Sequence, residues 1–208
     1  MRGKFITLEG VDGAGKSTHL RWLEEFMQGQ GIAVRSTREP GGTVVGEELR
    51  KLLLDRNQRL SAETETLLVF AARREHIAQV IAPALESGKW VLCDRFTDAT
   101  YAYQSGGSGV AWERVAALER WVQGELQPDL TLLFDVSTEV GRQRSQRGVA
   151  ADRFEREEEA YFRRVREAYL RRAQENPGRI RVIDANVNLA TVHKELEEVI
   201  SIYCSVKD

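Results

Sequence analysis

Short apolar segments of strand length alternate along the chain with longer segments in which apolar residues recur at helical spacing. Five segments have the length and apolar content of strands: 4–9, 32–37, 90–93, 130–136 and 180–183. The spacing of apolar residues predicts helices over 16–29, 63–86 and 189–203. Strands that alternate with helices in this way form a parallel sheet with helices on both faces. The pattern therefore predicts an α/β fold, and at ~150 residues per domain the 208 residues predict a single domain over 1–208.

Composition narrows the kinds of partner. The chain carries 30 Lys and Arg against 32 Asp and Glu, a net charge of −2, whereas a general nucleic-acid binder is normally basic. No apolar run approaches the ~20 residues that span a bilayer, and the apolar stretch before Glu9 is too short for a signal peptide. The two cysteines, Cys93 and Cys204, belong to no paired motif and are expected to be reduced thiols. We therefore expect a soluble cytoplasmic protein with no nucleic-acid and no membrane partner.

A phosphate-binding motif follows the first predicted strand. Residues 10–17 read G-V-D-G-A-G-K-S, which matches G-x-x-x-x-G-K-[ST], the P-loop. The glycines let backbone N–H groups approach phosphate oxygens, and the next helix presents the positive end of its dipole. In this motif Lys16 places its charge on the β- and γ-phosphates, and the Ser17 hydroxyl ligates Mg²⁺. The expected ATP-binding residues are Gly10, Val11, Asp12, Gly13, Ala14, Gly15, Lys16, Ser17 and Thr18.

The remaining motifs favour a small kinase among P-loop proteins. A GTPase would need a guanine-reading N-K-x-D, but the chain has no Asn-Lys pair, and a motor or remodelling ATPase is usually longer. A kinase needs cationic groups for its acceptor phosphate, and Arg38 and Arg95 each follow a predicted strand, where open α/β sheets bind ligands. The arginines of 142–153 are suited to stabilise the transferred group, or they form only a solvated helix face.

These motifs together resemble those of bacterial thymidylate kinases. The resemblance rests on 10–17, on T-R-E-P-G-G-T at 37–43, on D-R-F at 94–96 and on A-Y-Q at 102–104, and it extends from residue 5 to about 184. It implies the P-loop nucleoside monophosphate kinase fold: a five-stranded parallel sheet with helices on both faces, a monophosphate-binding region at about 38–105 and a short Arg-rich lid at about 142–154. It also implies a homodimer and the reaction ATP + dTMP → ADP + dTDP with Mg²⁺, a step of dTTP biosynthesis.

Position by position, the resemblance implies a dTMP site. Phe70 would stack on thymine and Arg74 would reach its O4 edge, while the Tyr103 ring would crowd the sugar 2′ position. Asp12 would approach the 3′-hydroxyl, and Arg95 would clamp the acceptor phosphate. The further residues implied around the base, the phosphate and the metal are Thr100, Gln104, Arg38, Arg50, Glu39 and Asp94.

Gly13 separates two variants of the family. One variant carries an arginine at this P-loop position, and the other has glycine there and a catalytic arginine in the lid. The sequence resembles the second variant, with Arg153 the favoured lid residue and Arg147 the second choice. Two other functions stay open: a kinase for another nucleotide or nucleoside, and a P-loop NTP-binding regulator without an acceptor.

Overall fold

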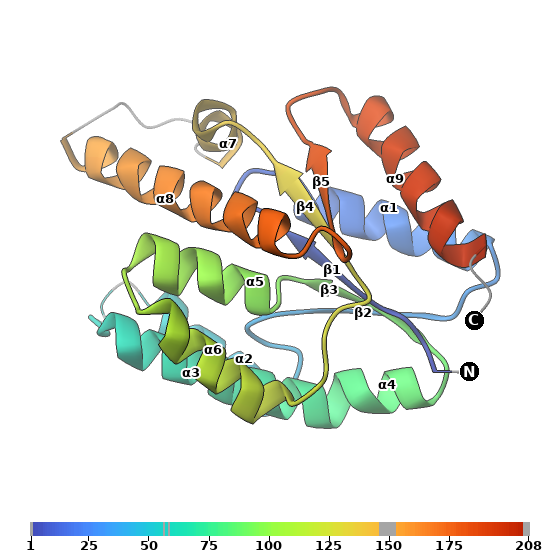
Figure 1. Cartoon of the computed structure of the whole chain (residues 1–208), viewed down its shortest axis with the longest axis horizontal. Helices are drawn as coiled ribbons and strands as arrows, with labels where there is room; N and C mark the ends of the chain where they lie inside the picture. The colour runs from blue at the N-terminus through green and yellow to red at the C-terminus, as the bar shows by residue number, and fades with distance from the viewer. Residues whose placement is uncertain (1, 56, 58, 146–152, 206–208) are drawn as a thin grey trace.

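A five-stranded parallel sheet forms the centre of the protein (Figure 1). The computed structural model describes residues 2–55, 57, 59–145 and 153–205. The strand order is β2-β3-β1-β4-β5, and each pairing is parallel. The predicted α/β fold with five parallel strands is confirmed. The strands are β1 (Phe5–Glu9), β2 (Val34–Arg38), β3 (Trp90–Asp94), β4 (Leu130–Asp135) and β5 (Ile180–Asp184).

Helices cover both faces of the sheet. On one face α1 and α9 pack on β1 and β4 through a core that includes Leu8, Leu23 and Leu196. On the other face η1 and α4 pack on β1 and β3, and Phe5 and Ile81 belong to that second core. No helix in the described part of the chain is long and apolar enough to cross a membrane. The helices are α1 (Lys16–Gly29), α2 (Val44–Leu54), α3 (Ala62–His76), η1 (Ile77–Ile81), α4 (Ala82–Glu86), α5 (Thr97–Thr100), η2 (Tyr101–Gly107), α6 (Trp112–Gln123), α7 (Thr138–Ser145), α8 (Arg153–Glu175) and α9 (Leu189–Ser205).

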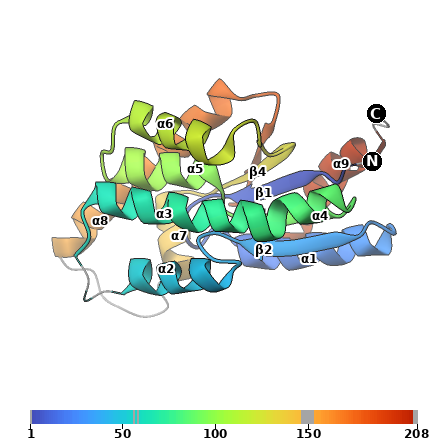
Figure 2. The ribbon, with the colours of Figure 1, turned by 90° about the horizontal axis from the view of Figure 1, so that it is seen from below.

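The single helix predicted over 63–86 is three consecutive helical segments. α3 and α4 run in one line along the sheet (Figure 2), and the π-helical turn η1 joins them. At its end the Ala82 N–H donates to the Ile77 carbonyl, five residues back. Pro83 follows, and a proline has no N–H to continue the α-helical pattern. The hydrogen-bond register therefore shifts here while the helix axis continues.

Alternation along β1 directs one buried acid toward the site. Successive side chains of a strand point to opposite faces, so Phe5, Thr7 and Glu9 share the face away from α1. Thr7 and Thr131 on neighbouring β4 bond through their hydroxyls at 2.8 Å. Glu9, two residues further on, is fully buried at the carboxyl end of the strand. This end of a parallel sheet is where ligands bind in such folds, and here the P-loop begins.

Candidate active site

The P-loop leaves β1 in a conformation that favours glycine at several points. Gly10 and Gly13 have φ of 137° and 80°, where L side chains are strained. A Cβ at Gly13 would lie 2.1 Å from the Gly141 carbonyl oxygen. Lys16 folds back over the loop and donates from Nζ to the carbonyls of Gly10 and Val11 at 3.0 and 3.1 Å. Because the ammonium is buried, its pKa is lowered to about 8.

A second part of the site lies beside the P-loop, between Ser17 and the end of β3. A cavity of about 410 Å³ brings Ser17 together with Asp94 and Arg38. Asp94 Oδ1 is buried and has no hydrogen-bond partner among the described residues. A buried carboxylate oxygen next to a P-loop hydroxyl is a suitable donor set for Mg²⁺, which uses one or two protein groups together with phosphate oxygens and water. The predicted metal residues Ser17 and Asp94 therefore line one cavity.

A second cavity, of about 390 Å³, is lined on its P-loop side by Asp12. It lies among α2, α3, η2, α8 and the end of β3, and both charged and apolar side chains line it. Most residues predicted for the acceptor site lie here together. The lining residues are Asp12, Glu39, Pro40, Arg50, Leu53, Leu54, Glu65, Val69, Arg73, Arg95, Phe96, Ala99, Thr100, Tyr103, Gln104 and Tyr161.

Arg95 connects the two halves of the site. Its Nη2 donates to Asp12 of the P-loop at 2.7 Å and to the Tyr103 hydroxyl at 3.0 Å, and its Cζ lies 4.7 Å from the centre of the Tyr103 ring. Its φ of 69° is positive, a conformation that costs ~1–3 kcal/mol for a non-glycine residue and is found mainly at functional sites. The guanidinium is thus held at the boundary between the P-loop and the second cavity.

Arg73 provides a second fixed cation, deep in that cavity. Nε donates to Glu39 Oε2 at 2.7 Å and Nη2 to Thr100 Oγ1 at 3.0 Å, with both pairs buried. Glu39 is held from its other side by His76 at 3.0 Å. The guanidinium also lies 4.9 Å from the Phe96 ring. Its Nη1 is buried and has no hydrogen-bond partner among the described residues.

The sequence and its fold both match one family. The family model of thymidylate kinase matches residues 8–196. The thymidylate kinase of Nitrosospira multiformis is 61% identical over 97% of this chain and 98% of its own length. That of Cupriavidus necator is 60% identical over 97% and 99%. The crystal structure of thymidylate kinase from Ehrlichia chaffeensis superposes with a TM-score of 0.79 at 35% identity, covering 97% of this chain and 99% of that one.

The chain belongs to the thymidylate kinase family. The family resemblance that the motifs implied is thereby confirmed, and so is the enzyme class, a nucleoside monophosphate kinase. The fold also matches a solved member of the family over nearly its whole length. The P-loop, the cavity lined by Ser17 and Asp94 (called the metal cavity below) and the cavity lined by Arg73 and Arg95 (called the acceptor cavity below) can therefore be considered as parts of one kinase site.

Two residues that the resemblance assigned to this thymidylate kinase site lie elsewhere. Phe70 is buried in a core cluster with Tyr101 and Val115, and Arg74 lines a separate groove between α3 and α6. Neither lines the acceptor cavity, so the structure does not bring these two residues together with the rest of the predicted dTMP site. Val69 and Arg73, one position earlier on α3, line it instead. Both pairs are four residues apart, and one residue turns a helix by about 100°, so this spacing cannot select the face.

Arg38 is also displaced from the acceptor cavity. It lines the metal cavity with Ser17 and Asp94, and it pairs with Glu47 at 2.9 Å. Arg50, in contrast, lines the acceptor cavity and donates to the Pro40 carbonyl at 2.9 Å. The cations that follow β2 are thus divided between the two cavities, whereas the sequence indicated one cluster.

The predicted lid falls mostly outside the described residues. Arg147 lies outside them, and of Arg153 the structure describes the backbone only, as the first residue of α8. The two assignments of a catalytic lid arginine therefore stay predictions.

Proposed function

We propose that this member of the family transfers the γ-phosphoryl group of ATP to dTMP, with Mg²⁺, to give ADP and dTDP. The observation that carries the proposal is the 2.7 Å pair between Asp12 and Arg95. Asp12 belongs to the loop that holds the triphosphate of the donor, and Arg95 lines the cavity for an acceptor. A phosphate on Arg95 would therefore lie beside the γ-phosphate of ATP, where close positioning lowers the barrier to transfer.

The acceptor cavity suits a nucleoside monophosphate with a carbonyl on its base. Arg95 and Arg50 line the part of the cavity that the phosphate would occupy, and Arg73 lies deeper, next to Thr100. A guanidinium can only donate hydrogen bonds, so the free Nη1 of Arg73 favours the O4 acceptor of thymine over the N4 amino group of cytosine. Val69 and Phe96 supply apolar surface to the base.

Ser17 and Asp94 are the residues that would hold Mg²⁺. The ion would neutralise part of the charge on the phosphates when the donor is bound. Lys16, released from the loop carbonyls, would then donate to the β- and γ-phosphate oxygens. We place this activity in the reducing cytoplasm, where a free exposed thiol such as Cys204 is compatible with the compartment.

The direct test of the reaction is product analysis. The protein, Mg·ATP and dTMP should give dTDP and ADP in equal amounts, and little ADP should form without dTMP. ADP formed at the same rate with and without dTMP would instead support a P-loop regulator. Phosphorylation of another monophosphate in place of dTMP would support the kinase for another nucleotide.

Tyr103 should determine the preference for deoxyribose. Its ring lines the acceptor cavity, and its hydroxyl accepts from Arg95. Tyr103→Ala should narrow the ratio of kcat/KM for dTMP over its ribose counterpart by about 10-fold or more, since the ring occupies the space that a 2′-hydroxyl needs. Tyr103→Phe keeps the ring and should keep the ratio. Steady-state kinetics with the two substrates measure it, and an unchanged ratio in Tyr103→Ala would exclude the steric role.

Arg153 is proposed to act on the transferring phosphoryl group, with Arg147 as the second choice. An interaction made only in the transition state lowers kcat when it is lost and leaves KM nearly unchanged. We therefore expect Arg153→Ala to lower kcat by about 100-fold with little change in KM for dTMP. A comparable loss in Arg147→Ala, with Arg153→Ala silent, would transfer the role to Arg147. No effect from either would remove the lid arginine from the mechanism.

We further propose that the enzyme is a homodimer through the apolar face formed by α2, α3 and α6. Val45 and Trp121 are 47% and 82% exposed there, and they line a groove of about 620 Å³. A contiguous apolar surface of this kind normally marks an interface. Arg74 and Glu75 also line the groove, so the face carries both charges and can pair with a second copy across a two-fold axis.

Trp121 provides the test of this dimer. A charge at the centre of an apolar interface is costly to bury, so Trp121→Glu should shift the sedimentation of the protein from dimer to monomer. Ile202 is also an exposed apolar side chain, 64% exposed, but on α9. Ile202→Glu is the matched control and should stay dimeric. A monomeric wild type, or a dimeric Trp121→Glu, would contradict this interface.

A further inference from the structure

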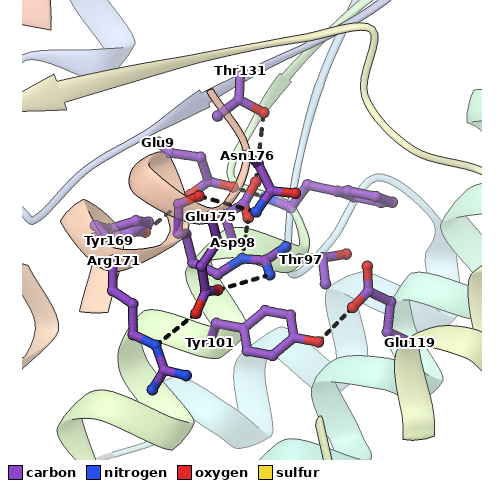
Figure 3. Close-up of polar contacts among 12 residues, drawn as sticks. Glu9, Thr97, Asp98, Tyr101, Glu119, Thr131, Tyr169, Arg171, Glu175 and Asn176 are labelled. Atoms are coloured by element: carbon purple, nitrogen blue, oxygen red, sulfur yellow. Dashed lines mark hydrogen bonds and ion pairs between the residues drawn. The ribbon is translucent and has the colours of Figure 1, made fainter. Parts of the chain in front are cut away.

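A buried chain of hydrogen bonds leads from the sheet to Arg95. Glu9, at the end of β1, accepts the Phe96 N–H on Oε1 at 2.7 Å. Its Oε2 accepts the Tyr169 hydroxyl at 2.9 Å (Figure 3). The Tyr169 oxygen in turn accepts from Arg95 Nη1 at 3.2 Å. Because the hydroxyl hydrogen is committed to Glu9, its oxygen is oriented as an acceptor for the guanidinium.

Glu9, where this series of hydrogen bonds begins, interacts with several charged side chains. Burial is the main reason why the pKa of Glu9 is raised to about 7; Asp98 on α5 adds to the rise, while Arg95 opposes it. Asp98 is itself ionised, since Arg179 and Arg172 lower its pKa through direct hydrogen bonds. The ionised form of Glu9 is therefore stabilised by hydrogen-bond donors such as Tyr169 and by the positive charge of Arg95.

Close packing of α8 on η2 fixes the Tyr169 hydroxyl. A Cβ at Gly106 would lie 2.5 Å from the Ala168 Cβ, so only glycine lets the two helices approach this closely. Arg164 of α8 donates to the Gly107 carbonyl at 3.0 Å. The Tyr169 side chain is 2% exposed. Its oxygen therefore has little freedom, and it offers Arg95 an acceptor at a defined position.

Asp12, the ion-pair partner of Arg95, holds the guanidinium only weakly in the acceptor cavity. The Asp12 side chain is 63% exposed, and an ion pair with such a partner contributes little. Asp12 also belongs to the P-loop, so the pair draws Nη2 toward the donor side. Tyr169 is the buried acceptor that holds Nη1, the opposite edge of the guanidinium.

We propose that Tyr169 is a positioning residue for phosphoryl transfer: its hydroxyl, oriented by Glu9, holds Arg95 where the guanidinium can bind the acceptor phosphate. The inference rests on the proposed role of Arg95 as the acceptor-phosphate clamp. It gives α8 a role in binding the acceptor phosphate through Tyr169, which lies outside the predicted lid. The sequence does not indicate this role of Tyr169, because Tyr169 is 160 positions from Glu9 and 74 from Arg95.

Tyr169→Phe is the variant that tests this role. It removes the hydroxyl and keeps the ring that packs in the core. We expect kcat/KM for dTMP to fall by about 10-fold, the effect of one hydrogen bond to a charged group, mostly through KM for dTMP. KM for ATP should stay within about 2-fold. Tyr101→Phe is the matched control: this tyrosine is also buried and its hydroxyl donates to Glu119 at 2.5 Å, so its loss should leave KM for dTMP unchanged.

A double-mutant cycle with Arg95→Ala separates a positioning role from a structural one. If Tyr169 acts through Arg95, Tyr169→Phe should cause no further loss of kcat/KM in the Arg95→Ala protein. An equal 10-fold loss in both backgrounds would overturn the proposal, and so would wild-type kinetics of Tyr169→Phe. Titration calorimetry with dTMP gives the same comparison without turnover, and the melting temperature of each variant reports on folding. If Arg95→Ala itself leaves the kinetics with dTMP unchanged, the clamp assignment of the proposed function has failed instead.

Discussion

Lys16→Ala should lower kcat/KM by at least ~100-fold, about 2.7 kcal/mol of transition-state stabilisation. Lys16 is the P-loop cation, held at the loop by the Gly10 and Val11 carbonyls. Alanine removes its charge from the β- and γ-phosphates, while β1 and α1 keep their packing through Leu8 and Leu23. The fold should therefore survive, which circular dichroism checks, and the loss should be visible in steady-state kinetics with Mg·ATP.

A control variant and a pH profile extend the test of Lys16. Lys51→Ala removes an exposed lysine on α2 and should leave kcat/KM unchanged. In the wild type, kcat/KM for ATP should decline as pH rises through about 8, because Lys16 is charged below that pH and neutral above it, and kcat/KM reports the pKa values of the free enzyme. Wild-type turnover and ATP affinity in Lys16→Ala would contradict the assignment of the P-loop.

Arg73→Met should both destabilise the protein and remove its discrimination between bases. Arg73 is 1% exposed and neutralises the buried carboxylate of Glu39, and removing one partner of a buried ion pair costs ~3–5 kcal/mol. The ratio of kcat/KM for dTMP over dCMP should fall by about 10- to 100-fold, since a donor facing the N4 amino group costs ~1–3 kcal/mol. Urea denaturation and steady-state kinetics measure the two effects.

Arg74→Met is the matched control for Arg73→Met. Arg74 is the next residue along α3, but it lines the groove on the apolar face and lies outside the acceptor cavity. Its replacement should leave the ratio of dTMP over dCMP unchanged. The opposite outcome, with discrimination lost in Arg74→Met and kept in Arg73→Met, would restore the assignment that the family resemblance implied and contradict the geometry of the cavity.

The strands and the P-loop could be predicted because their signals are local. Each predicted strand corresponds to an observed strand to within two residues at each end. The motif at 10–17 includes the residues that bend the loop, so its positive φ at Gly10 and Gly13 follows from the sequence. Where residues close in the sequence determine the local structure, as in these strands and the P-loop, the predicted and the observed structure agree.

The side chains that complete the acceptor site depend on distant contacts, and the sequence does not show these. Arg73 and Arg74 are adjacent cations on one helix, and the choice between them rests on Glu39 and Thr100, 34 and 27 positions away. The same holds for Arg38, which pairs with Glu47 at the metal cavity. The spacing of apolar residues also did not predict α2 and α6. These helices carry apolar residues on the exposed face proposed as the dimer interface, so their sequences lack a simple division into one apolar and one polar side.

The most direct test of the account is the rate of ADP release with four acceptors in the presence of Mg·ATP. The free Nη1 of Arg73 and the ring of Tyr103 predict that dTMP has the highest kcat/KM. dUMP should follow it as a poorer substrate, since the thymine methyl adds only ~0.8 kcal/mol of apolar contact. dCMP and the ribose counterpart of dTMP should lie far below both. Release of ADP that does not depend on dTMP, or dCMP used as well as dTMP, would contradict the account.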